Sequence, residues 1–215
     1  MIRVSPVREP SAFDARVRRR GQDWLAKNTR SQKRPPDYWS EFTVELEHGF
    51  GKLCGYAAMF DPTGGTVDHY KSIKNYRELA YEWSNYRFSS AVLNAMKKNA
   101  DDSILDPYEV EEGWFEILLP SLIMRATDTI PVQLRSKAEY TLNRLQLRQG
   151  ERILRWRQSW YELYLSGEIE LSALRKFAPL IACAIEKENR KNRASGSRST
   201  YVQMQDTKAK LQRKL

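Results

Sequence analysis

Apolar residues recur at helical spacing towards both ends of the chain. Residues 12–29 and residues 38–50 each carry an apolar stripe with steps of three or four positions, and Pro35-Pro36 separates the two segments. The same spacing returns over residues 138–165, where Gly150 is a point of interruption, and over residues 171–191. The pattern therefore predicts helical segments at both ends of the chain.

The region between residues 53 and 106 has a different pattern. Residues 53–60 predict a short extended or looped segment, and Asp61-Pro62-Thr63-Gly64-Gly65 predicts a turn. Residues 66–70 and 85–89 favour two strands joined by a polar loop, and residues 92–98 favour a short helix. Leu105-Asp106-Pro107 closes this unit. Strands set between helical segments predict an α+β fold.

Four regions follow from this interpretation. Residues 1–50 form a basic helical N-terminal arm, and residues 51–110 form the small strand–strand–helix unit. Residues 111–192 are expected to be a helical C-terminal region. Residues 193–215 are expected to be a basic flexible tail, because Ser, Gly and Arg are frequent at its start.

Charge changes this picture by suggesting a partner. The formal net charge is +9, and the first 36 residues hold ten Arg or Lys against three acidic residues. Such a balance favours a polyanionic partner such as nucleic acid. Arg18, Arg19 and Arg20 are candidate nucleic-acid contacts, although the same run also fits a solvated helix face.

Several classes of protein are disfavoured. Only two cysteines and two histidines are present, so a disulfide framework and any mechanism that needs several histidines are not expected. No apolar run approaches the roughly 20 residues that span a bilayer, and the first residues lack a signal-peptide pattern. We therefore expect a cytoplasmic protein with no membrane partner.

The candidate chemistry lies in Asp68-His69, Asn85 and Asn94. A His at a strand end can serve as general base, while Asp and Asn oxygens suit Mg²⁺. Asn94, Lys97 and Lys98 fall on one face of the predicted helix. A lone His beside an Asp is more often a surface pair, and Asn94 alone is typical of a helix surface. The residues taken alone leave both interpretations open.

This arrangement resembles the HNH endonuclease superfamily, whose ββα-metal finger has Asp-His at a strand end, an Asn after a loop, and a His or Asn nine residues later. The resemblance implies that His69 is the general base, that Asp68 and Asn94 hold Mg²⁺ or Mn²⁺, and that Asn85 braces the loop. Lys97 stands where the family often has a basic residue. Lys97 and Lys98 are then expected to contact nucleic acid.

A subfamily resemblance adds detail. Residues 68–71, 79–85 and 104–107 are similar to HNH nucleases of bacterial anti-phage defence loci, of the PtuB type in Septu and related retron systems. That similarity covers roughly residues 50–165. It implies a defence role and an SMC-like ATPase partner, and a homo-oligomer is also compatible.

The sequence departs from many such fingers in its cysteines. Two Cys-x-x-Cys pairs would fall at 54/57 and 90/93, but the chain has Cys54, Ala57, Ser90 and Leu93. One thiol cannot make a tetrahedral zinc site, so we expect no structural zinc. The leading hypothesis is DNA cleavage. An RNA endonuclease acting on a target such as tRNA, and an inactive nucleic-acid-binding or regulatory subunit, stay open as alternatives.

Overall fold

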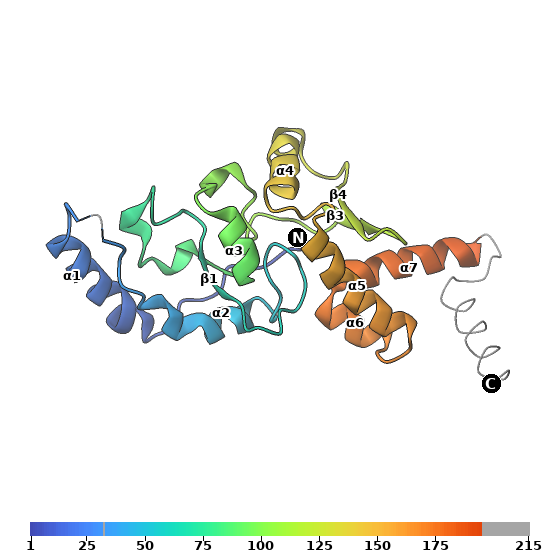
Figure 1. Ribbon diagram of the computed structural model, residues 1–215, viewed down its shortest axis with the longest axis horizontal. Coiled ribbons are helices and arrows are strands. Elements are labelled where there is room, and N and C mark those ends of the chain that lie inside the picture. Colours follow the sequence, from blue (N-terminus) through green and yellow to red (C-terminus); the bar gives the residue numbers. More distant parts are fainter. Residues whose placement is uncertain (32, 195–215) are drawn as a thin grey trace.

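The computed structural model describes residues 1–31 and 33–194, which mix helices with two small antiparallel hairpins. The elements extend along one long axis, with α1 at one end and α7 at the other (Figure 1). The prediction of an α+β class is confirmed. The α-helices are α1 (Arg19–Lys27), α2 (Thr43–Gly49), α3 (Ala91–Lys97), α4 (Val132–Arg144), α5 (Glu151–Leu165), α6 (Leu171–Phe177) and α7 (Pro179–Ala194).

The central hairpin pairs β1 (Thr66–His69) with β2 (Tyr86–Ser89), and α3 follows directly. These bounds agree with the predicted strands and helix to within one residue. Val67 lies opposite Phe88 and His69 opposite Tyr86, so β-branched and aromatic side chains pair across the strands. Ser90 begins α3 as its N-cap, because its hydroxyl accepts a hydrogen bond from the Leu93 amide at 3.3 Å.

Two buried cores lie on either side of this hairpin. One is shared by the N-terminal helices and the strands, and it brings Phe13, Trp39 and Leu46 against Val67 and Phe88. The other contains α3 and most of the C-terminal half of the chain. The predicted N-terminal arm is therefore part of the wall of the central unit, since the two bury the same apolar surface.

The N-terminal segment contains less regular helix than predicted. Residues 12–29 begin with a π-helical turn, η1 (Asp14–Arg18), before α1, and residues 38–50 begin with a 3-10 turn, η2 (Trp39–Phe42), before α2. Gly21 of α1 is needed at a close approach, because an added Cβ would lie 2.1 Å from the Tyr81 ring. Aromatic packing therefore determines how α1 lies on the central unit.

The C-terminal region, predicted to be largely helical from residue 111, begins with a hairpin. There β3 (Phe115–Leu118) pairs with β4 (Ile123–Ala126), and α7 packs on β3. Four-residue strands give too short an alternation to stand out in sequence. Gly150 interrupts residues 138–165 as predicted, between α4 and α5. The expected helix over 171–191 is instead two helices, because Pro179 excludes the α conformation at Ala178.

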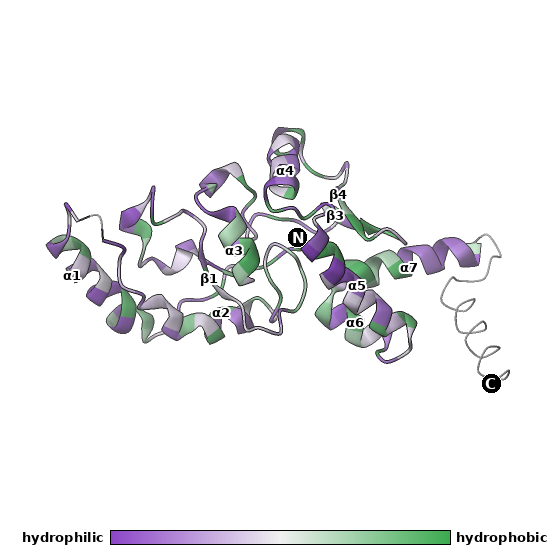
Figure 2. Ribbon diagram, viewed as in Figure 1, coloured by the Kyte–Doolittle hydropathy of each residue, from purple (hydrophilic) through white to green (hydrophobic). Residues whose placement is uncertain are grey.

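Polar residues cover α1 and the outer part of α7, whereas apolar residues gather near α5 and the inner part of α7 (Figure 2). None of the helices in residues 1–31 and 33–194 has the length and apolar content needed to cross a membrane. The predicted tail lies outside the described residues from position 195 onward.

Arg18, predicted as a nucleic-acid contact, is bound by three carboxylates of the protein itself. Its guanidinium reaches Glu9 at 2.7 Å, Asp14 at 3.2 Å and Glu82 at 3.1 Å, and its side chain is 21% exposed. Glu82 belongs to the loop between β1 and β2. Arg18 therefore ties the N-terminal segment to that loop, and four of the five N–H groups of its guanidinium donate to these carboxylates.

We predict that Arg18→Ala lowers the free energy of unfolding by about 2 kcal/mol, because it removes charge-assisted hydrogen bonds from a half-buried network. The matched control is Arg19→Ala, whose side chain is 75% exposed and pairs with Asp14. That control is expected to change stability by less than about 0.5 kcal/mol. Urea denaturation of both variants checks this, and equal losses would contradict the assignment of Arg18 to the network.

Candidate active site

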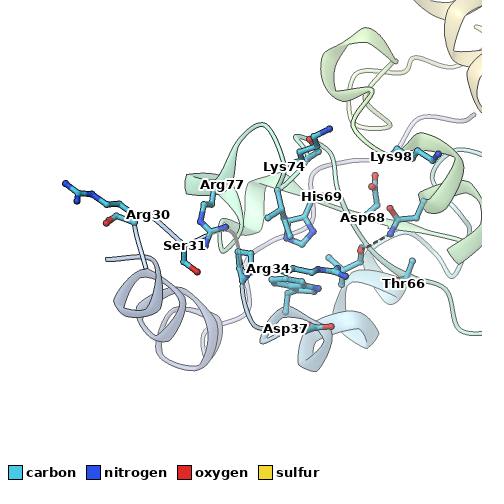
Figure 3. Close-up of a pocket in the computed structure, with 17 residues that line it drawn as sticks. Arg30, Ser31, Arg34, Asp37, Thr66, Asp68, His69, Lys74, Arg77 and Lys98 are labelled. Atoms are coloured by element: carbon cyan, nitrogen blue, oxygen red, sulfur yellow. Dashed lines mark hydrogen bonds between the residues drawn. The ribbon is translucent and has the colours of Figure 1, made fainter. Parts of the chain in front are cut away.

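A cleft of about 690 Å³ opens beside the end of β1 (Figure 3). Residues 29–31, 33–37 and 72–77 form one side of the cleft, and the C-terminal end of α3 forms the other. Asp68, His69 and Asn94 all line this space. Three of the predicted site residues, far apart in sequence, therefore share one cleft.

His69 lies at the end of β1 in an aromatic surround. Its ring packs edge-on against Trp39 and Tyr86, with ring centroids 4.5 Å and 4.9 Å away. Its Nε2 is 2.8 Å from the carbonyl oxygen of Ala80. A carbonyl oxygen only accepts hydrogen bonds, so Nε2 carries the proton and Nδ1 has the free lone pair.

Burial also sets the charge of this histidine. It lowers the pKa of His69 from the ordinary 6.5 to about 4, and the nearby cations Lys97 and Arg34 act in the same direction. The imidazole is therefore neutral at neutral pH. Within the described residues, Nδ1 has no hydrogen-bond partner, so it can accept a proton from a molecule in the cleft.

Asp68 is almost completely buried and both of its oxygens have partners. Tyr56 donates its hydroxyl to Oδ2 at 2.7 Å, and the ammonium of Lys97 lies 3.0 Å from Oδ1. Lys97 also donates to the His69 carbonyl oxygen at 2.6 Å, and its side chain has no exposed surface. Lys97 was predicted to contact nucleic acid, but in this structure its ammonium group forms a buried ion pair with Asp68.

Asn94 lines the cleft from α3. Its nitrogen donates to the Val67 carbonyl oxygen at 3.3 Å, which sets the orientation of the amide. Its Oδ1 has no hydrogen-bond partner within the described residues and is a neutral oxygen donor. The predicted face of α3 is therefore split, because Asn94 and the exposed Lys98 line the cleft while Lys97 is buried beneath it.

Asn85 closes the loop that joins β1 to β2. Its Oδ1 accepts from the Lys71 amide at 2.7 Å, and its Nδ2 donates to the carbonyls of Lys71 at 2.9 Å and Leu79 at 3.2 Å. The loop contains the 3-10 turns η3 (Arg77–Leu79) and η4 (Trp83–Asn85). These bonds place the Ala80 carbonyl under His69, so Asn85 occupies the bracing position predicted for it.

Basic side chains surround the cleft. Arg30, Arg34, Lys74, Arg77 and Lys98 line it, against the carboxylates of Asp37 and Asp68. Arg18, Arg19 and Arg20 do not line it. Arg20 instead lies over the Tyr38 ring at 4.2 Å. The basic N-terminal stretch therefore contributes to the site through Arg30 and Arg34, at the bend before Pro35, and not through the arginine run.

Sequence reasoning missed Tyr56, Arg34 and Arg77. The signal for Arg34 was present, since it belongs to the basic first 36 residues and precedes the Pro35-Pro36 bend. No spacing rule links Tyr56 to Asp68. Arg77 comes from an irregular loop, whose path depends on hydrogen bonds that the sequence pattern does not reveal.

The four positions of the resemblance-based zinc pairs lie together in the fold. Cys54, Ala57 and Leu93 are buried in one core, and the Ser90 amide donates to Cys54 Sγ at 3.3 Å. Within residues 1–31 and 33–194, no three His, Cys, Asp or Glu side chains group to hold a metal ion. A metal beside His69 would therefore depend on the amide oxygen of Asn94 together with Asp68.

Comparison with known proteins found no matching family model, no matching curated protein and no matching solved structure.

The depressed pKa of His69 predicts a pH dependence of stability. Between about pH 4 and pH 6.5 the unfolded chain binds a proton at His69 that the folded chain does not. The free energy of unfolding should therefore fall as the pH falls through this window, by up to about 3 kcal/mol from this residue.

The measurement is urea denaturation in metal-free buffer for the wild type and for His69→Gln, which cannot titrate in this range. The difference between the two isolates the histidine. A difference that stays constant from pH 7 to about pH 4 would contradict the predicted shift.

Proposed function

We propose that this protein is a metal-dependent endonuclease of the HNH type that hydrolyses phosphodiester bonds in DNA. The observation that carries the proposal is the Nε2 bond of His69 to the Ala80 carbonyl, 2.8 Å long. It leaves Nδ1 as proton acceptor in a cation-lined cleft that also holds Asp68 and Asn94.

His69 is the general base in this mechanism. Nδ1 takes a proton from a water molecule while the oxygen of that water bonds to phosphorus. The bond from phosphorus to the leaving oxygen breaks, and the leaving oxygen takes up a proton from solvent. The Ala80 carbonyl bonded to Nε2–H then stabilises the imidazolium that forms. Basic side chains around the cleft reduce the cost of gathering negative charge there.

Asp68 and Asn94 fit a divalent cation by the chemistry of their donors. One carboxylate and one amide oxygen are hard ligands that suit Mg²⁺ or Mn²⁺, which keep water and substrate oxygens in their remaining positions. When bound there, the ion would neutralise charge on the phosphate. Lys97 contacts Asp68 Oδ1 at 3.0 Å, so an ion on that oxygen would share it with an ammonium group.

The order of elements also supports the proposal. An antiparallel hairpin with His69 at the end of its first strand leads into a short helix that carries Asn94. This is the order expected of a ββα-metal finger. Packing among Cys54, Ala57 and Leu93 takes the place of structural zinc in this proposal.

The biological setting rests on the motif resemblance. We propose that the protein is a cytoplasmic anti-phage effector that acts beside an SMC-like ATPase. Self-association of the protein is compatible with this role. Phosphate-centred chemistry does not select the sugar, so RNA is the alternative substrate. A binding or regulatory subunit is the alternative without catalysis.

Cleavage of supercoiled plasmid and of a structured RNA, with Mg²⁺ or Mn²⁺, tests the function. His69→Ala is expected to reduce the rate by about 10²–10⁴-fold, because the base is lost. Circular dichroism checks that the variant stays folded, since the ring also packs on Trp39 and Tyr86. Asn94→Ala is expected to weaken metal use, and added metal should restore part of its rate but not that of His69→Ala.

Each result of this assay separates the alternatives. Cleavage of RNA alone would favour the RNA enzyme. No cleavage by the wild type of either substrate, even with the ATPase partner supplied, would favour the binding subunit. A His69→Ala variant as fast as the wild type would contradict the assignment of the base.

Lys97 offers a second test of the metal. Lys97→Met should lower the free energy of unfolding by about 3–5 kcal/mol, because it leaves the buried Asp68 carboxylate without its ion-pair partner. Mg²⁺ should restore part of that loss, because it binds the folded state in place of the ammonium. Thermal denaturation with and without Mg²⁺ measures the effect. A variant that Mg²⁺ does not stabilise would argue against a metal on Asp68.

A further inference from the structure

Arg77 is held in one orientation at the side of the cleft that faces His69 (Figure 3). Its Nη1 donates to the Lys33 carbonyl oxygen at 3.0 Å, and its guanidinium lies over the Trp24 ring, 5.1 Å from the centroid. One hydrogen bond and one ring face therefore restrict the rotation of this side chain. An arginine placed only for solubility would not be constrained in this way.

The other edge of the same guanidinium has no partner. Nε and Nη2 of Arg77 are both buried, and neither forms a hydrogen bond within the described residues. A buried donor without an acceptor is destabilising, so such a group calls for an explanation. The Nε–Nη2 edge carries two parallel N–H groups, which match two oxygens of one phosphate.

The neighbouring cations are also without carboxylate partners. Within residues 1–31 and 33–194, Arg30, Arg34, Lys74 and Arg77 form no salt bridge, although all four line the cleft. Arg18 and Arg87, by contrast, are paired with Glu9 and Asp106. The four cations of the cleft therefore keep a positive charge that no salt bridge within the described residues neutralises, and this charge attracts a polyanion.

We infer that Arg77 is a phosphate-binding residue, which binds a backbone phosphate of the nucleic acid through its Nε–Nη2 edge while the base His69 acts in the same cleft. This inference rests on the proposed function for the identity of the polyanion. Arg34 and Lys74 supply charge around that phosphate, and Arg77 supplies the directed pair of hydrogen bonds. The wall formed by residues 29–31, 33–37 and 72–77 is thus the substrate-binding side of the site.

The test measures binding of a short labelled DNA duplex, and of RNA of the same sequence, to the full chain carrying His69→Ala in magnesium-free buffer. Adding Arg77→Gln should weaken binding about tenfold, as expected for loss of a charge-assisted pair of hydrogen bonds. The slope of log affinity against log salt should fall by about 1, since one phosphate contact is lost.

Two further variants separate charge from geometry. Arg125→Gln is the control, because Arg125 is 52% exposed and pairs with Glu116 on the β3–β4 hairpin, away from the cleft. It should leave affinity and slope unchanged. Arg77→Lys keeps the charge but not the paired N–H edge, so it should keep the slope and still lose affinity. If Arg77→Gln does not fold, Arg77→Lys decides the question.

Affinity and slope that are the same for Arg77→Gln and Arg125→Gln would overturn the inference, as would a folded Arg77→Lys that binds as tightly as its parent. Failure of the parent chain to bind either duplex would overturn it too. The nuclease proposal is judged separately by plasmid cleavage, so a chain that binds through Arg77 but never cleaves would refute catalysis alone.

Discussion

One buried ammonium group joins the helix of the candidate site to its strand. Lys97, the last residue of α3, lies 3.0 Å from Asp68 Oδ1 and donates to the His69 carbonyl oxygen at 2.6 Å. Two charges taken out of water are costly unless they remain paired and hydrogen-bonded, so this contact tolerates little movement. It sets α3 against β1, and with that the position of Asn94 relative to His69.

The loop between β1 and β2 positions the His69 ring through the Ala80 carbonyl oxygen. Asn85 binds the backbone at Lys71 and Leu79, and the loop so held turns the Ala80 carbonyl towards the imidazole. Tyr86 donates to the same carbonyl oxygen at 2.8 Å. The Ala80 carbonyl oxygen has two lone pairs and accepts both hydrogen bonds. The orientation and the tautomer of the His69 ring are therefore determined by a backbone carbonyl of the loop.

The cationic side chains of the protein fall into two groups: some form ion pairs that stabilise the fold, and others form none. Arg18 and Arg87 form ion pairs with carboxylates and lie over aromatic rings, and these contacts hold the N-terminal segment and β2 in place. Within the described residues, the arginines and lysines of the cleft form no salt bridge, although Arg77 lies over the Trp24 ring. An arginine near a carboxylate therefore stabilises the fold, whereas an arginine without one keeps its charge for a ligand.

The sequence by itself determined the α+β class, the bounds of β1, β2 and α3 to within one residue, and the grouping of His69 with Asp68 and Asn94. The element bounds depend on local rules, namely helical spacing and turn residues, whereas the grouping of His69 with Asp68 and Asn94 follows from the motif resemblance. The β3–β4 hairpin was missed because four-residue strands give little periodic signal, and the break at Ala178-Pro179 was overlooked although Pro marks it. Only the tertiary structure decided the partners of each charge. Lys97 faces inward, Arg18 is neutralised and Arg77 reaches the cleft, because these outcomes depend on which distant segments the two cores bring together.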